Sequence, residues 1–201
     1  MKSLYKNEQS GRSMVEMLGV LAIIGVLSIG GISGYSKAMS KYRVNKTLDQ
    51  ISMLVINIRT LFSSSVNYEG LDPTLAVKMG IVPRDMQAGT ASSRVIRNSY
   101  QGQVFLGVGG TKDAADNTKF YVEYTGLPQE ACVSIATADW GSQAGSGLQS
   151  IQVGETKNKT TDTIEGTNVF EIDNLPISLK DATNACSGTT DNGNGIKWFY
   201  Y

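Results

Sequence analysis

The stretch Gly11–Tyr35, GRSMVEMLGVLAIIGVLSIGGISGY, reads as a helix that could cross a membrane, apart from a single acidic residue, Glu16. The apolar run from Met14 to about Ile32 has roughly the ~20 residues that the core of a bilayer requires of a helix. An unpaired carboxylate at depth in lipid is costly. Either this run does not lie in a membrane, or Glu16 has a partner that the single chain does not contain.

The helical pattern continues beyond the apolar run. Apolar residues recur at spacings of three and four, which places one apolar stripe along a helix. The stripe consists of Val44, Leu48, Ile51, Val55, Ile58 and Phe62. No proline interrupts the chain from Met14 to Ser65. The sequence therefore predicts one long α-helix, hydrophobic over residues 12–35 and amphipathic over residues 36–65, where the stripe packs on a globular domain.

The length of the apolar run and the charges beside it help to distinguish a membrane span from a signal peptide and to orient the span. A secretory signal peptide also has a basic start and an apolar run, but that run is shorter and is followed by small residues at a cleavage point. Here the run passes directly into the amphipathic helix. Basic residues lie on both sides of it, with Lys2, Lys6 and Arg12 before it and four more between residues 37 and 46 after it. The positive-inside rule therefore orients the span only weakly.

Composition argues against several kinds of enzymatic site. The 201 residues include 18 basic and 18 acidic side chains, so the formal net charge is zero and a general nucleic-acid binder is not favoured. The chain has no histidine and two cysteines, Cys132 and Cys186. Zinc sites, Cys/His pairs and Ser/His/Asp triads are therefore excluded or incomplete. We expect no catalytic residue, no cofactor and no metal.

The region from residue 66 to residue 201 has the pattern of a loop-rich β domain. Short helices are expected between Asp72-Pro73 and Gly80, and from Pro128 onward with Cys132 and Ile135 on one face. Strands are expected at 101–110, 119–127, 148–155, 168–172 and 195–201. The segment 119–127 alternates apolar and polar residues, as a half-buried strand does. The predicted fold is α+β, an antiparallel sheet laid on one long helix.

Two glycine-containing motifs are interpreted as turns. The sequence GVGG at 107–110 lacks the spacing of a dinucleotide-binding loop. The sequence DNGNG at 191–195 offers oxygen donors close enough for calcium, but one aspartate and two asparagines fall short of a full ligand set. The residue types at Cys132 and Cys186 leave two readings open, a disulfide preserved in an oxidising compartment or two buried reduced thiols.

Gly11, followed by Arg-Ser-Met-Val, Glu16 and an apolar run that enters a long helix, resembles the prepilin signature of type IV pilins and of type II secretion pseudopilins. The resemblance implies a leader of residues 1–11, which prepilin peptidase removes after Gly11, and N-methylation of the new N-terminus at Arg12. The family usually has an apolar residue where this chain has Arg12. It also implies that Glu16 forms an assembly salt bridge with the N-terminal amine of a neighbouring subunit. If Glu16 instead lies shallowly at the headgroups, no such pair is needed.

The order YEGL, MGIVPRDM and GT within residues 68–90, then LPQEAC at 127–132 and a second cysteine near the C-terminus, resembles the type IVb subgroup, which contains the conjugative thin-pilus and toxin-coregulated pilins. The resemblance implies a disulfide between Cys132 and Cys186 that bounds the region 132–186. It also implies that part of the helix melts on assembly. The candidate positions for this melting are Gly25, Gly30, Gly31 and Gly34, where helix propensity is low.

These resemblances predict a structural protein, the major subunit of a type IVb pilus. It would be held by a single span in the bacterial inner membrane and then polymerised by pilus assembly machinery into a helical homo-oligomer outside the cell. The filament would serve adhesion, aggregation or mating-pair contact with a surface receptor or recipient cell. A minor pilin or a type II secretion pseudopilin is the alternative within this class. A membrane-tethered periplasmic enzyme or binding protein is the alternative outside it.

Overall fold

The computed structural model describes residues 10–90, 93–110, 116–141, 146–156, 164–188 and 193–201. The chain divides into two compact units, Met1–Tyr42 and Arg43–Tyr201. The second unit is called the head. One helix, α1 (Ser10–Leu61), contributes to both units. The predicted long N-terminal helix is therefore confirmed.

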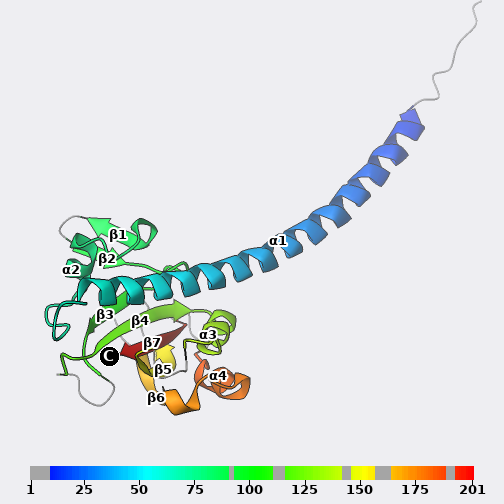
Figure 1. Cartoon of the computed structure of the whole chain (residues 1–201). Helices are drawn as coiled ribbons and strands as arrows, with labels where there is room; N and C mark the ends of the chain where they lie inside the picture. Colours follow the sequence, from blue (N-terminus) through cyan, green and yellow to red (C-terminus); the bar gives the residue numbers. More distant parts are fainter. Residues whose placement is uncertain (1–9, 91–92, 111–115, 142–145, 157–163, 189–192) are drawn as a thin grey trace, which may run out of the picture. The chain divides into compact units, whose positions relative to one another are not determined.

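The head contains short helices and two antiparallel sheets (Figure 1). Its helical segments after α1 are α2 (Pro73–Lys78), η1 (Arg84–Met86), α3 (Gln129–Ala136), η2 (Ile172–Asn174) and α4 (Leu179–Ala185). A two-stranded sheet pairs β1 (Gln87–Thr90) with β2 (Ser93–Ile96). The five-stranded sheet has the order β3-β4-β7-β5-β6. Its strands are β3 (Val104–Val108), β4 (Phe120–Leu127), β5 (Leu148–Thr156), β6 (Ile164–Glu171) and β7 (Asn194–Tyr200).

The core of the head lies between the amphipathic part of α1 and one face of the five-stranded sheet. Ile51, Val55 and Ile58 of the predicted stripe are buried, and Val44, Leu48 and Phe62 pack against them at the margin. The sheet contributes alternate residues of the paired strands β4 and β7, including Val122 and Trp198. Burial of a large apolar side chain contributes about 1.5–3 kcal/mol. The α+β architecture expected from the sequence is therefore confirmed, with the stripe in its expected role.

The end of α1 differs from the prediction. The amphipathic part was expected to reach residue 65, but α1 ends at Leu61 and residues 62–64 form a turn. The Thr60 and Ser63 hydroxyls donate to the Ile56 and Thr60 carbonyl oxygens at 2.8 and 2.9 Å. Hydroxyl side chains that bond to nearby backbone groups compete with helix, and a serine run therefore favours termination.

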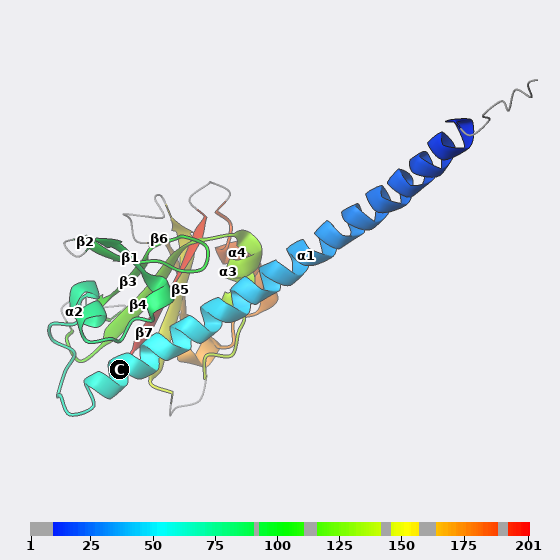
Figure 2. The same cartoon turned by 90° about the horizontal axis from the view of Figure 1, so that it is seen from above.

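The short helices follow the start signals in the sequence. The Leu75 backbone N–H donates to Asp72 Oδ1 at 2.7 Å, which caps α2, and Gly80 after its end has a φ of 72°. Helix α3 follows Pro128 with Cys132 and Ile135 buried, as predicted. Figures 1 and 2 both place α3 beside α4, at the end of the head opposite to α2.

Several elements were missed or misread. The β1–β2 hairpin and α4 have no counterpart in the sequence prediction. Helix α4 carries a signal that could have revealed it, because the Asp181 backbone N–H donates to Ser178 Oγ at 3.2 Å in a Ser-x-x-Asp cap. The GVGG turn at 107–110 was also wrong, since its first two residues belong to β3. The segment TKDAADN at 111–117, which the sequence predicts as a helix or a loop, falls mostly outside the described residues.

Candidate functional site

The side chains of the apolar part of α1, which lies in the first unit, are exposed. From residue 14 onward these side chains are exposed, Met14 to 71% and Ile29 to 73%. By length and composition, α1 is the one helix among the described residues that could cross a membrane, with a mean hydropathy of 2.2 in its most apolar window. A continuous apolar surface of this length requires lipid or other protein around it.

Glu16 lies in the exposed part of α1, near the start of the apolar run. The backbone of Gly11 and Arg12 is helical, and their side chains lie outside the described set. The expected cleavage between Gly11 and Arg12, methylation of Arg12 and ion pairing of Glu16 therefore remain predictions.

The four glycines proposed as melting positions all lie within continuous α1. A Cβ placed on Gly25, Gly30, Gly31 or Gly34 would meet no atom within 4 Å outside the backbone of its own turn. Alanine would thus fit without a clash at each position. Among the described residues, no neighbour of these glycines requires the absence of a side chain, so any need for them would arise in lipid or in contact with another copy.

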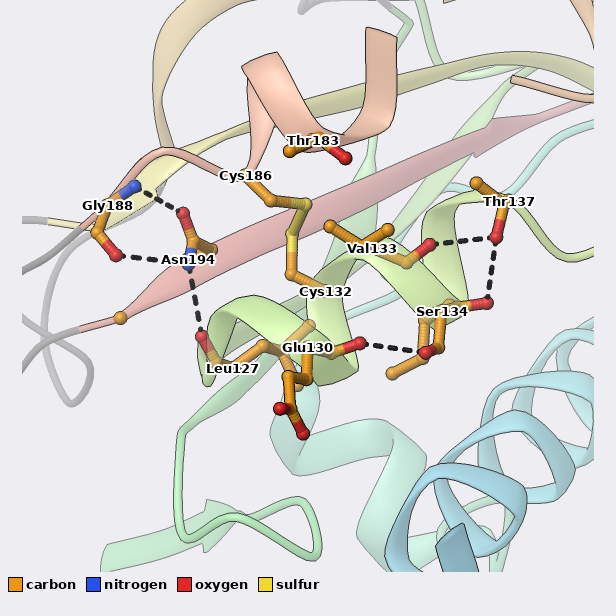
Figure 3. Close-up of a disulfide and its surroundings, with 12 residues drawn as sticks. Leu127, Glu130, Cys132, Val133, Ser134, Thr137, Thr183, Cys186, Gly188 and Asn194 are labelled. Atoms are coloured by element: carbon orange, nitrogen blue, oxygen red, sulfur yellow. Dashed lines mark hydrogen bonds between the residues drawn. A yellow bond between two sulfur atoms is a disulfide. The ribbon is translucent and has the colours of Figure 1, made fainter. Parts of the chain in front are cut away.

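The disulfide joins two helices at one end of the head. Cys132 lies in α3 and Cys186 is the residue that ends α4, and the structure links them with their Cα atoms 5.9 Å apart (Figure 3). Both side chains are fully buried. The bridge spans a sequence separation of 54 residues and encloses β5, β6 and η2.

A buried asparagine holds the chain that follows the disulfide. The Gly188 backbone N–H donates to Asn194 Oδ1 at 2.7 Å (Figure 3). Asn194 Nδ2 in turn donates to the carbonyl oxygens of Gly188 and Leu127 at 3.3 and 3.4 Å. The sequence prediction treated 191–195 as a turn and missed this role. Residues 189–192 lie outside the described part, so calcium binding there has no structural account.

One ion pair links the amphipathic part of α1 to η1, and another links two strands of the five-stranded sheet. Lys46 Nζ lies 2.8 Å from Asp85 Oδ2, and Gln50 Nε2 donates to the same oxygen at 3.1 Å, which ties α1 to η1. The hydrogen bond from Lys46 is the main cause that lowers the pKa of Asp85 below its ordinary value. In the sheet, Lys197 Nζ lies 3.2 Å from Glu123 Oε2, whose side chain has no exposed surface.

Among the described residues, no group of three or more His, Cys, Asp or Glu side chains could hold a metal ion. A hollow of about 240 Å³ at the end of α1 is lined by Asn57, Thr60, Leu61, Met79, Gly80 and Ile81, so its lining contains no acid or base.

Comparison with known proteins agrees with this architecture. The family model for Bundlin matches residues 36–200. The major structural subunit of the bundle-forming pilus of Escherichia coli O127:H6 is 27% identical over 145 residues, which cover 71% of this chain and 72% of the relative. The toxin coregulated pilin of Vibrio cholerae is 26% identical over 136 residues, or 66% of this chain and 59% of the relative.

A solved structure shows the same fold. The crystal structure of a type IV b pilin from Salmonella typhi matches with a TM-score of 0.55 at 19% identity, covering 78% of this chain and 98% of the other. The long apolar helix, the antiparallel sheet and the sequence matches to pilus subunits define the class, which is that of the type IV pilins. The chain belongs to the Bundlin family. The family match begins at residue 36, after the apolar run, and so does not include Gly11, Arg12 or Glu16.

Proposed function

We propose that the protein is the major structural subunit of a type IVb pilus and that its chemistry is assembly rather than catalysis. The observation that carries the proposal is the family match over residues 36–200, and it is supported by the relatives, which are a major structural subunit of a bundle-forming pilus and a toxin coregulated pilin. The exposed apolar half of α1 supports it, because such a surface suits first a membrane and then the interior of a filament.

The proposed life cycle assigns a role to each part of the chain. Residues 1–11 are a leader, which prepilin peptidase removes after Gly11. Residues 12–35 anchor the subunit in the inner membrane and later form the filament core. Residues 36–61 form the amphipathic part of α1, and residues 62–201 form the rest of the head, with the region 132–186 bounded by the disulfide. In the filament Glu16 pairs with the N-terminal amine at Arg12 of a neighbouring copy.

The test is electron microscopy of sheared surface material from the native bacterium, together with mass spectrometry of the sheared protein. A major pilin gives abundant filaments composed of this chain, with a mature N-terminus at Arg12. Traces confined to filament tips or bases would indicate a minor pilin. An intact Met1 in assembled filaments would refute the prepilin processing, and the absence of filaments would favour a tethered enzyme or binding protein.

A further inference from the structure

A short segment at the end of the apolar part of α1 differs from the rest of that part because it contains lysine side chains. Residues 17–36 contain no charged side chain, whereas residues 35–42 read Tyr-Ser-Lys-Ala-Met-Ser-Lys-Tyr. We call residues 35–42 the collar segment. It is helical, it lies entirely in the first unit, and its two tyrosines and two lysines are all exposed. No acidic residue lies between Glu16 and Asp49 to neutralise the lysines within the helix.

The collar segment has two distinct faces. Tyr35 and Tyr42 are seven residues apart, about two turns, and therefore share one face of the helix. Lys37 and Lys41 are four residues apart and share a second face. Two residues correspond to about 200° of rotation, so Lys37 lies on the side of the helix opposite to Tyr35. The tyrosine side chains are exposed to 68% and 58%.

The position of this segment along α1 matches the thickness of a bilayer. Between Glu16 and Lys37 the helix rises about 32 Å at 1.5 Å per residue. The hydrocarbon core of a bilayer is about 30 Å thick. In the membrane-anchored stage, Glu16 near one headgroup layer places the lysines in the other, and its pairing with a neighbouring copy belongs to the later filament stage. Tyrosine and lysine are both favoured at that depth, tyrosine for its amphipathic ring and lysine for its long apolar stem.

We infer that the collar segment binds anionic phospholipid headgroups, with Lys37 and Lys41 contacting the phosphates and Tyr35 and Tyr42 lying at the edge of the acyl chains. The inference rests on the proposed membrane-anchored stage of the subunit. It assigns the segment a definite task, which is to hold α1 at a fixed depth until the subunit is drawn into a filament. A lysine near an anionic surface strengthens binding roughly fivefold.

The test uses the full chain purified in detergent micelles that contain equal amounts of phosphatidylglycerol and phosphatidylcholine. Native mass spectrometry measures the ratio of the two lipids that stay bound. We expect phosphatidylglycerol to be enriched at least about fivefold over its level on the Lys37→Gln/Lys41→Gln variant. The matched control is Lys78→Gln/Lys180→Gln, which removes two exposed charges from α2 and α4 of the head and should leave the enrichment unchanged.

Two further arms separate the alternatives. Tyr35→Ala/Tyr42→Ala should reduce the retention of both lipids alike without changing their ratio. Excess inorganic phosphate should fail to displace phosphatidylglycerol, and its displacement would show a general phosphate site instead of a headgroup site. An unchanged lipid ratio in the lysine variant would overturn the inference while leaving the pilin function intact. Loss of the wild-type chain from micelles would instead contradict the membrane-anchored stage.

Discussion

Glu123 and Lys197 form an ion pair within the five-stranded sheet. They lie directly opposite each other in the β4–β7 register, and the carboxylate is completely buried. Lys197 Nζ also lies 3.9 Å from the centroid of the Tyr121 ring, which supplies a cation–π contact. A buried charge is tolerated when it is paired, and removal of one partner leaves the other in a medium that solvates it poorly. The lysine is therefore needed because the glutamate is there.

Lys197→Met should destabilise the head by about 3 kcal/mol or more, because it keeps the apolar stem but removes the cation from Glu123. Urea unfolding of the purified pilin measures the loss. The double variant Glu123→Gln/Lys197→Met is the matched control, and it should recover part of the stability since no buried charge remains. Equal stability of the single variant and the wild type would contradict this role of the pair.

Asp85→Asn should lower stability by less than about 1 kcal/mol at neutral pH, because the pair with Lys46 is partly exposed. The pKa of Asp85 is lowered in the folded protein. Its contribution is therefore fully present above the ordinary aspartate pKa of about 3.9 and is lost as pH falls through the lower folded value. Unfolding at pH 6 and at pH 2 should show the difference from wild type shrinking in acid. Asp173→Asn, at an exposed position on η2, controls for a general charge effect.

At the scale of elements, burial was predicted best where a periodic pattern of apolar residues extends over many residues. The stripe from Val44 to Phe62 repeats over five turns of α1, so its burial could be inferred without the structure. Strand β4 was expected to be half-buried, yet Glu123 on its polar face has no exposed surface. That outcome depends on Lys197, a strand neighbour far away in sequence, and local alternation does not report such pairing. The β1–β2 hairpin was missed because its strands are too short to show a periodic pattern of apolar residues.

The disulfide connects α3 to α4 and should act mainly on the stability of the head. For a loop of this size the chain-entropy estimate is roughly 4 kcal/mol. Cys132→Ser should therefore lower the thermal stability and the abundance of the subunit before it changes the form of the filament. Thermal unfolding and immunoblots of whole cells measure these effects, with Cys132→Ser/Cys186→Ser as the control for an unpaired thiol. Free-thiol labelling of both cysteines in native pili would contradict the bridge.

Gly30 and Gly31 form the weakest point in the apolar part of α1, since each glycine is about 1 kcal/mol worse than alanine in a helix interior. Gly30→Ala/Gly31→Ala should therefore stiffen the filament or hinder its assembly, while membrane insertion remains. Alanine introduces no clash at either position in the isolated chain. Pilus extension under force measures the effect, with Ala22→Gly as the opposite change. A filament reconstruction with an unbroken helix from Gly25 to Gly34 would refute the melting hypothesis.

At the scale of the whole molecule, the candidate site could be proposed from the sequence because its parts are local. The acidic residue, the apolar run and the glycines all lie within a single helix, where spacing alone decides which residues share a face. The hydrogen bonds near the disulfide could not be predicted from the sequence. Asn194 bonds to Gly188 and Leu127, so its role depends on the end of a strand 67 residues earlier in the chain. A buried asparagine of this kind looks like a turn residue until the fold is known.

Glu16 connects the two environments that the proposed function requires of α1. In lipid a carboxylate disfavours insertion, so Glu16→Val should leave membrane anchoring intact or improve it. In a filament the same change should leave the N-terminal amine of a neighbour without its partner, at a cost of roughly 3–5 kcal/mol, and subunit addition should weaken about a hundredfold or more. Membrane fractionation and electron microscopy of sheared pili measure the two effects separately. Asp49→Val, which removes an exposed carboxylate from the amphipathic part of α1, is the matched control and should still assemble. Normal piliation by Glu16→Val would place the carboxylate at the headgroups and remove it from the assembly contact.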